Sequence, residues 1–206
     1  MKSTFHPLNT LVLLRSGLPA RDLNKVTSAV DQVQVRVVSP ASISGGRLLG
    51  VDSPLLNLPR DVVARHSIKE GNVVVSSRGE FVAGVVETDP SELTGGVPLV
   101  AGPLCHVLTL DPKAPQPLSP GYLAWLLGTE YARQHMVASS RGSAVSLYTK
   151  ETVGSLLVPV LEMKTQRGIY EAAKATKLLR DARLALAEAE SETNNADLCR
   201  LAGIRA

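Results

Sequence analysis

The chain has 206 residues, of which 44% are hydrophobic and 20% are charged, and these proportions are typical of a soluble globular protein. A chain of this length can bury a core without metals or disulfides, and with 3% aromatic residues that core must consist of Val, Leu, Ile and Ala. The formal net charge of +3 permits contact with nucleic acid without requiring it. Cys105 and Cys199 are isolated in the sequence, which favours free thiols in a reducing cytoplasm. The apolar run at residues 11–14 is too short for a secretory signal or a membrane span, so we expect a cytoplasmic chain without a membrane partner.

The part of the chain before residue 100 is rich in β-branched residues and predicts mostly strands. Alternation of apolar and polar side chains indicates a half-buried strand, and two β-branched runs around a glycine-containing turn indicate a hairpin. Pro59 is a favourable first residue for a helix. In chain order we expect a strand at 32–38, a turn at 39–46, a short strand at 47–51, a short helix within 55–66, a hairpin of strands 73–77 and 81–86 with its turn at 78–80, and a polar loop at 88–96.

The part of the chain from residue 104 to residue 160 alternates strands and helices. Ser119 and Pro120 favour the start of a helix, because Ser can cap free N–H groups and Pro fits the first turn. Pro159 lacks the N–H that a central strand requires, so the last strand should lie at a sheet edge. We expect a strand at 104–110, a proline-rich connector at 111–120, a helix over 122–136, a polar glycine-bearing segment at 137–148 and a strand at 154–160.

From Glu162 the composition changes to alanine and leucine interleaved with charged residues, which predicts a helix roughly 40 Å long. Alanines allow a partner helix to approach closely, and an imperfect seam for that partner follows the three-four spacing of a coiled coil. The polar residues 191–195 should end the helix, and residues 196–206 should form a short turn or a frayed tail. The predicted seam consists of Ile169, Ala172, Thr176, Leu179, Arg183 and Leu186.

Patterns that carry catalysis are missing from the sequence. The four histidines are not paired at metal spacing, and His106 in an apolar strand is typical of a core histidine. Neither Gly45-Gly46 nor Gly95-Gly96 has the partners of a phosphate-binding loop, and no serine lies in a nucleophile elbow. The carboxylates are dispersed. We therefore predict that the chain is not an enzyme and that it holds no metal and no cofactor.

Two polar loops combine arginine, serine and glycine beside regular structure, at 76–79 and at 139–143. Arginine can donate a bidentate fork to guanine or phosphate, serine hydroxyls adapt to either, and glycine lets the backbone come close. The alternative is that both loops are ordinary polar turns with an exposed arginine. The candidate DNA contacts are Arg78 and Arg141, supported by Ser76, Ser77, Ser140, Ser143, Tyr148 and Lys150, with Arg47 and Lys69 as phosphate contacts.

Four segments with characteristic motifs occur in a set order. They are Val35 to Gly46, then Ile68 to Gly79 (IKEGNVVVSSRG, with Asn72 where Asp is usual), then Leu118 to Leu127 (LSPGYLAWLL), and finally Val158 to Ile169 (VPVLEMKTQRGI). In the last segment Pro159, Gln166 and Ile169 keep the motif spacing. In this order, over roughly residues 30 to 190, the chain resembles one half of the specificity subunit of a type I restriction–modification system.

The resemblance implies an α/β (α+β) target-recognition domain with a mixed sheet, followed by a long helix that acts as a coiled-coil spacer. The domain, at 1–160, would read one half of a split DNA site, with a helical spacer and dimerisation region at 161–192 and a tail at 193–206. Catalysis would come from methyltransferase (modification) subunits and a restriction or translocase subunit. Full-length members carry two domains and two helices, so one of each implies a homodimer with antiparallel helices and a palindromic DNA target.

Two other hypotheses stay open on the sequence. One is a protein–protein adaptor or inhibitor of such a complex, which keeps the fold but does not read DNA. It is favoured by Leu161 and Glu162, which replace prolines of the family motif, and by Gly168 in the first helical turns. The other is a small enzyme with an unrecognised site.

Overall fold

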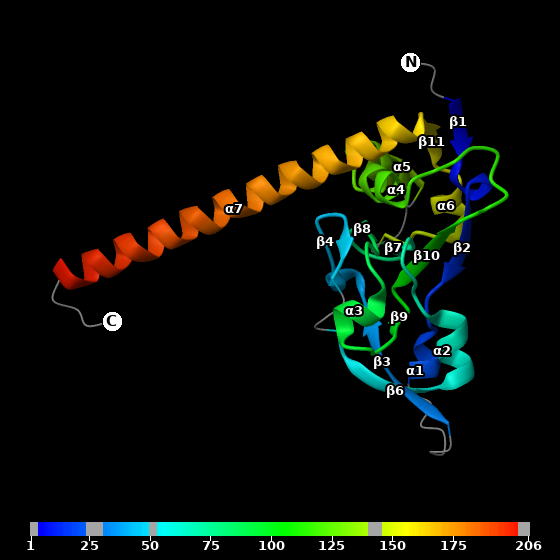
Figure 1. The fold of residues 1–206 in the computed structure, drawn as a ribbon, viewed down its shortest axis with the longest axis horizontal. Coiled ribbons are helices and arrows are strands. Elements are labelled where there is room, and N and C mark those ends of the chain that lie inside the picture. The colour runs from blue at the N-terminus through cyan, green and yellow to red at the C-terminus, as the bar shows by residue number, and fades with distance from the viewer. Residues whose placement is uncertain (1–3, 24–30, 50–52, 140–145, 202–206) are drawn as a thin grey trace. The chain divides into compact units, whose positions relative to one another are not determined.

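The computed structural model describes residues 4–23, 31–49, 53–139 and 146–201. The chain divides into two compact units, residues 1–168 and residues 169–206. The first unit holds the sheets and the short helices, and the second consists of most of the long helix α7 (Met163–Leu201) (Figure 1). Within the described ranges, no helix is long and apolar enough to cross a membrane.

The described strands of the first unit form three sheets. The largest has the order β2-β10-β7-β8-β5-β4, a second has the order β6-β3-β9, and β1 pairs with β11. The β5–β8 and β3–β9 pairs are parallel and the other pairs are antiparallel, so the sheets are mixed, as predicted. The strands are β1 (Thr4–Pro7), β2 (Val12–Ser16), β3 (Gln32–Val38), β4 (Ile43–Ser44), β5 (Arg47–Leu48), β6 (Leu55–Pro59), β7 (Val73–Ser76), β8 (Ala83–Val85), β9 (Leu99–Ala101), β10 (Cys105–Leu110) and β11 (Leu157–Val160).

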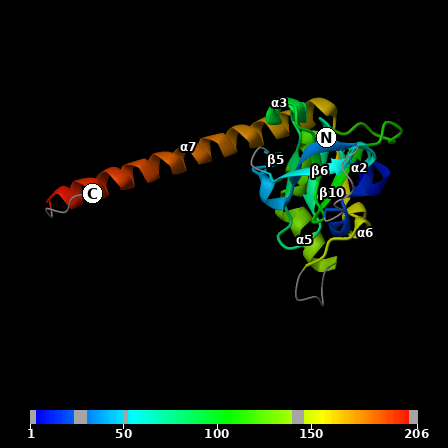
Figure 2. The same ribbon diagram turned by 90° about the horizontal axis from the view of Figure 1, so that it is seen from below.

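The helices of the first unit are short. In α6 the Thr149 hydroxyl accepts a hydrogen bond from the Thr152 backbone N–H at 3.1 Å and so caps the helix N-terminus. Helices α5 and α6 lie side by side (Figure 2). The helices are η1 (Leu8–Thr10), α1 (Ala20–Leu23), η2 (Pro40–Ser42), α2 (Arg60–His66), α3 (Pro90–Thr94), α4 (Pro120–Leu127), α5 (Glu130–Ser139) and α6 (Lys150–Gly154).

Several predicted elements are confirmed. The strand at 32–38 is β3, the hairpin is β7 and β8 in antiparallel register, and the strand at 104–110 is β10. Pro120 begins α4 after Ser119 at the cap position, but the Ser119 hydroxyl makes no capping hydrogen bond, so that part of the prediction is wrong. Pro159 lies in a two-stranded sheet opposite Phe5, which agrees with the expected edge position because neither strand of such a pair is central.

Two predicted helices are wrong in part. Residues 55–59 form β6, because they pair along β3 from Gln32↔Pro59 onward, and α2 begins only at Arg60. The helix expected over 122–136 divides into α4 and α5, since Gly128 ends α4 and the Thr129 hydroxyl donates to the Leu126 carbonyl at 2.6 Å. The pairing of β6 with β3 is a tertiary effect, and the hydrogen bond from a side chain to a helix carbonyl is a local one. Helical periodicity in the sequence predicts neither of them.

Three boundaries are also corrected. The expected loop at 88–96 contains α3, and Gly154 ends α6 instead of beginning a strand. The expected break at 191–195 is wrong, because α7 continues to Leu201. The Thr193 hydroxyl donates to the Ala189 carbonyl at 2.9 Å within the helix. Residues 191–195 include neither Gly nor Pro, and their individual helix penalties are small compared with one of those breakers.

The centre of the first unit is β7. Val73, Val74 and Val75 are fully buried, and the strand lies between β8 and β10. Val74 and Val107 belong to one core cluster with Leu48, Ile68 and Leu99. A strand buried on both faces in this way gives a rigid base for the turn that follows it.

The first turns of α7 are held by Gln166, whose side chain is fully buried. Its amide nitrogen donates to the Pro117 and Leu161 carbonyls at 3.0 and 2.8 Å, and its amide oxygen accepts from the Ser119 N–H at 2.8 Å. Gln166, which keeps the spacing of the sequence motif, therefore joins the start of α7 to the connector before α4. Gly168 has nothing within 4 Å of an added Cβ, so packing does not require glycine there.

Candidate nucleic-acid interface

The turn between β7 and β8 is braced from inside by Ser76. This side chain is fully buried, and its hydroxyl donates to the Glu80 carbonyl at 2.7 Å and accepts from the Val82 N–H at 3.0 Å. At the tip, Gly79 has a φ of +79°, a conformation that favours glycine. Ser76 thus shapes the turn, and its side chain has no surface with which to contact a ligand.

The tip of this turn pairs with a segment about 70 residues further along the chain. Arg78 and Leu147 face each other in an antiparallel bridge. On either side of that pair, the Gly79 N–H donates to the Ser146 carbonyl at 3.0 Å and the Tyr148 N–H donates to the Ser77 carbonyl at 2.9 Å. The structure therefore joins the β7–β8 turn to the residues that directly follow 140–145.

Tyr148 also holds this junction together. Its side chain is buried, its hydroxyl donates to the Gly79 carbonyl at 2.7 Å, and its ring meets Phe81 edge to face with centroids 5.1 Å apart. These contacts leave Tyr148 little surface of its own. In the described structure it positions the turn, whereas the sequence suggested a direct contact.

His106 in β10 supports Tyr148. Its Nε2 lies 2.7 Å from the Tyr148 carbonyl oxygen, and because a carbonyl only accepts, Nε2 carries the proton. Burial lowers the pKa of His106, the hydrogen bond to Tyr148 raises it, and the nearby charge of Lys150 lowers it. The Nδ1 atom is buried without a hydrogen-bond partner among the described residues. His106 is thus a buried neutral support with one ring nitrogen satisfied.

The junction leaves Arg78, Leu147 and Lys150 exposed, with Ser77 half-buried beside them. The Ser77 backbone is fully engaged, since its N–H donates to the Leu104 carbonyl at 2.8 Å and its carbonyl accepts from Tyr148. An exposed guanidinium on a fixed backbone, opposite an apolar side chain, can meet both phosphates and base edges. Ser140, Arg141 and Ser143 lie outside the described residues.

Arg47 and Lys69 lie away from this junction. Arg47 in β5 pairs with Val85 in β8, and Val85 pairs with Val73, the first residue of β7. Arg47 is therefore level with the start of β7, whereas Arg78 follows the end of β7. The Arg47 guanidinium forms an ion pair with the Glu87 carboxylate. The structure does not bring this predicted phosphate contact to the Arg78 turn.

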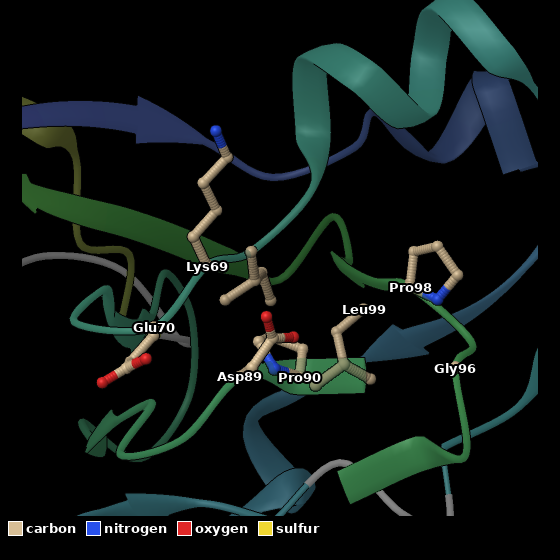
Figure 3. Close-up of a pocket in the computed structure, with 8 residues that line it drawn as sticks. Lys69, Glu70, Asp89, Pro90, Gly96, Pro98 and Leu99 are labelled. Carbon is tan, nitrogen blue, oxygen red and sulfur yellow. The ribbon is translucent and has the colours of Figure 1, made fainter. Parts of the chain in front are cut away.

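Lys69 precedes β7 and lines a pocket of about 420 Å³ between the loop before β7, the start of α3 and β9. Its ammonium points away from the carboxylates of Glu70 and Asp89 (Figure 3). Leu99 and Pro98 line the apolar side of this pocket. It lies at the opposite end of β7 from the Arg78 turn, so it does not belong to the same surface.

The predicted helix seam lies on the exposed surface of α7. Leu179 and Leu186 are 53% and 61% exposed, and the Thr176 hydroxyl donates to the Ala172 carbonyl at 2.9 Å. Ile169 is half-buried and Arg183 is exposed. A second stripe, missed in the sequence reading, has small residues at strict seven-residue spacing, and it consists of Gly168, Ala175, Ala182 and Ala189 with Leu178 and Ala185 between them.

Sequence reasoning missed three residues of the junction. Leu147 was read only as part of a polar segment, Phe81 as a strand residue and His106 as a core histidine. The scarcity of aromatic residues, at 3%, singles out Phe81 and Tyr148, but no local pattern signals that they meet. No group of His, Cys, Asp or Glu suited to a metal ion occurs within the described part of the chain.

No protein-family model matches this sequence, and no curated protein sequence matches it either. Solved structures do match. The HsdS subunit from Thermoanaerobacter tengcongensis is 19% identical with a TM-score of 0.60, and the match covers 93% of this chain and 46% of that chain. A chain from a study of complex assembly and conformational transition of the type I R-M system is 14% identical with a TM-score of 0.59, covering 95% of this chain and 43% of that one.

The S subunit of a type I restriction-modification system from M. genitalium is 14% identical with a TM-score of 0.51, again covering 95% of this chain and 43% of that chain. The chain therefore has the fold of type I S subunits, and it spans less than half the length of these solved chains. The fold expected from the order of the sequence motifs is confirmed.

Proposed function

We propose that this chain is the DNA-recognition component of a type I-like restriction–modification system. The observation that carries the proposal is the Arg78 turn, in which an exposed guanidinium sits on a backbone held by β7, Tyr148 and Phe81. The fold likeness over 93% and 95% of the chain supports it. Because the backbone that carries this cation is already held, binding does not have to order the loop first, which suits a rigid duplex.

In this proposal Arg78 reads a base or grips a phosphate, and Lys150 contacts the backbone. Arg141, Ser140 and Ser143 are further proposed contacts, which lie outside the described residues. Ser77 contributes its hydroxyl, whereas Ser76 and Tyr148 shape the turn. Arg47 and Lys69 belong to a different surface. Their substitution would affect binding less than substitution of Arg78.

The chain supplies recognition, and methyl transfer or cleavage comes from partner modification and restriction subunits. This division follows the resemblance stated for the sequence motifs. An adaptor without DNA affinity is the competing function, and the binding experiment below separates the two.

A second copy of the chain is the proposed partner of α7. Basic residues dominate its first half and acidic residues its second, so opposite charges meet only when two copies run antiparallel. The small-residue stripe allows close approach, and Leu179 and Leu186 of the predicted seam flank it. The charged residues are Lys164, Arg167, Glu171, Lys174, Lys177, Arg180 and Asp181 in the first half, and Arg183, Glu188, Glu190, Glu192, Asp197 and Arg200 in the second.

The charges also suggest a register. If the overlap is centred near Asp181, Lys174 of one copy lies opposite Glu188 of the second, because residue numbers run in opposite directions. The like charge of Asp181 at the centre is compensated within each helix by Lys177, whose ammonium lies 3.0 Å from its carboxylate. Such a dimer would read two half-sites related by a two-fold axis.

The dimer is tested by charge exchange, with molecular mass in solution as the readout. Lys174→Glu and Glu188→Lys should each raise the dissociation constant several-fold at low salt, and the double variant should restore it. A strict monomer at all concentrations, or single variants that behave like the parent chain, would reject the antiparallel pair.

DNA recognition is tested by selecting bound duplexes from a random library and measuring their affinity across salt concentrations. The parent chain should prefer the selected sequence and show a steep salt dependence. Arg78→Ala and Arg141→Ala should each cost about tenfold or more for a base contact, or weaken all sequences alike for a phosphate contact. Arg60→Ala, at an exposed ion pair with Asp31, is the matched control. Absence of salt-dependent duplex binding by the parent chain would favour the adaptor.

A further inference from the structure

The Arg78 turn presents an apolar side chain beside its cation. Leu147 is 48% exposed, and it faces Arg78 across the antiparallel bridge. The flanking hydrogen bonds run from Gly79 to Ser146 and from Tyr148 to Ser77, so the Arg78–Leu147 pair lies between them and is itself not hydrogen-bonded. Residues in such a pair have their side chains on the same face and closest together.

The spacing of this pair corresponds to neighbouring base pairs in a duplex. Cβ atoms of directly opposed residues are about 4.5–5.5 Å apart, and base pairs follow one another every 3.4 Å or so along a strand. An arginine fork recognises guanine through O6 and N7, and the main apolar feature of the major groove is the C5-methyl group of thymine. One member of the pair therefore suits guanine and the other suits a thymine next to it.

The geometry also lowers the cost of ordering the backbone of Leu147. Its backbone is bounded by the two hydrogen bonds above, and the buried Tyr148 that follows it is bonded to the Gly79 carbonyl. A side chain held in this way contributes its apolar contact without first ordering a loop.

We infer that Leu147 is a specificity-determining residue that contacts the thymine methyl group of the base pair adjacent to the one contacted by Arg78. This inference rests on the proposed DNA-recognition function. It predicts that the selected target contains a thymine next to the guanine whose replacement is most damaging. It assigns a role in sequence preference to a residue that carries no charge and no hydrogen-bonding side chain.

The experiment uses the full chain and its selected duplex, in which each thymine is replaced in turn by deoxyuridine, which differs only in lacking the methyl group. At one thymine the parent chain should lose about three- to fivefold in affinity, as expected for burial of one methyl group. Leu147→Ala should bind the thymine duplex less tightly by a similar factor and should not distinguish thymine from uracil at that position. Its salt dependence should be unchanged, because no phosphate contact is lost.

The matched control is Leu55→Ala, a leucine with a similar exposed fraction of 46% in β6. It should keep the parent preference for thymine, and thermal unfolding of both variants should match the parent chain. If the parent chain binds its duplex selectively and Arg78→Ala weakens it, but uracil is tolerated at every position, the role of Leu147 is overturned and the proposed function stands. If Leu147→Ala still distinguishes thymine from uracil, the role is likewise overturned. If the parent chain binds no duplex selectively, both proposals are overturned together.

Discussion

The Arg78 turn and helix α7 both expose basic and apolar side chains, but they obtain their shape in different ways. The turn is held by hydrogen bonds that span 69 residues, from Tyr148 to Gly79. Along α7, side-chain hydrogen bonds such as those from Thr176 to Ala172 and from Thr193 to Ala189 join residues four apart. The turn therefore takes its shape from the rest of its unit. Helix α7 is stabilised by bonds between its own neighbouring turns and leaves Leu178 71% exposed. Long-range contacts favour recognition of a rigid ligand, and an unburied helix favours pairing with a second helix.

The largest expected effect concerns the point where α7 joins the first unit. Gln166→Ala removes a buried amide that satisfies the Ser119 N–H and the carbonyls of Pro117 and Leu161. We expect the free energy of unfolding to fall by about 3 kcal/mol in urea denaturation. Lys164→Ala, at an exposed position in the same turn, should change it by less than about 0.5 kcal/mol. Equal stability of the two variants would show that α7 is independent of the first unit from its first residue.

The next effect concerns the face of α7 that is proposed to pair with a second copy. Ala182→Glu places bulk and charge in the small-residue stripe, and we expect the dimer dissociation constant to rise about tenfold or more. Ala187→Glu makes the same change about 140° around the helix and should leave the constant within about twofold. Sedimentation at several concentrations measures both. If Ala187→Glu raised the dissociation constant more than Ala182→Glu did, the interface would lie on the opposite face of α7.

A smaller effect is expected from loosening the turn without removing a cation. Tyr148→Phe keeps the ring contact with Phe81 but removes the hydroxyl that donates to the Gly79 carbonyl. The affinity for the selected duplex should fall about threefold or more, and exchange of the Gly79 amide hydrogen should accelerate. Tyr131→Phe removes an equivalent bond, from a tyrosine hydroxyl to the Leu157 carbonyl at 2.8 Å, and should change neither quantity. Indistinguishable results for the two variants would remove the positioning role of Tyr148.

The smallest effect is a pH dependence of stability. Burial holds the pKa of His106 below its ordinary value of 6.5, so the unfolded chain takes up a proton before the folded chain does. The stabilisation is fully present above about pH 6.5 and decreases as the pH falls below that value. His106→Gln, which keeps a donor for the Tyr148 carbonyl, should reduce the change in the denaturation midpoint between pH 7.5 and pH 5. His66, whose pKa is also lowered by burial, contributes to the same slope, so His106→Gln should reduce the slope further in a His66→Gln background. A parent chain with no such slope would contradict the neutral buried state of His106.

Local sequence patterns predicted the structure correctly where an element depends on residues close to it in the sequence. The alternation at 32–38, the hairpin around 78–80 and the Ser119-Pro120 start each depend on neighbours in the sequence, and the structure confirms them. The patterns failed where a distant partner decides. Residues 55–59 are a strand because β3 lies beside them, and Ser76 and Tyr148 are buried because the turn folds onto Ser146 and Leu147.

The sequence by itself determined the strand at 32–38, the β7–β8 hairpin, the presence and composition of the helix after Pro159, and the fold class. It also determined the charge asymmetry of α7, because this depends only on residue order along one helix. Only the tertiary structure decided which polar residues of the 76–79 loop reach the surface. Arg78 and Leu147 are brought into one exposed pair by hydrogen bonds between segments about 70 residues apart. Contacts of that separation arise from packing around β7, and periodicity along the chain carries no record of them.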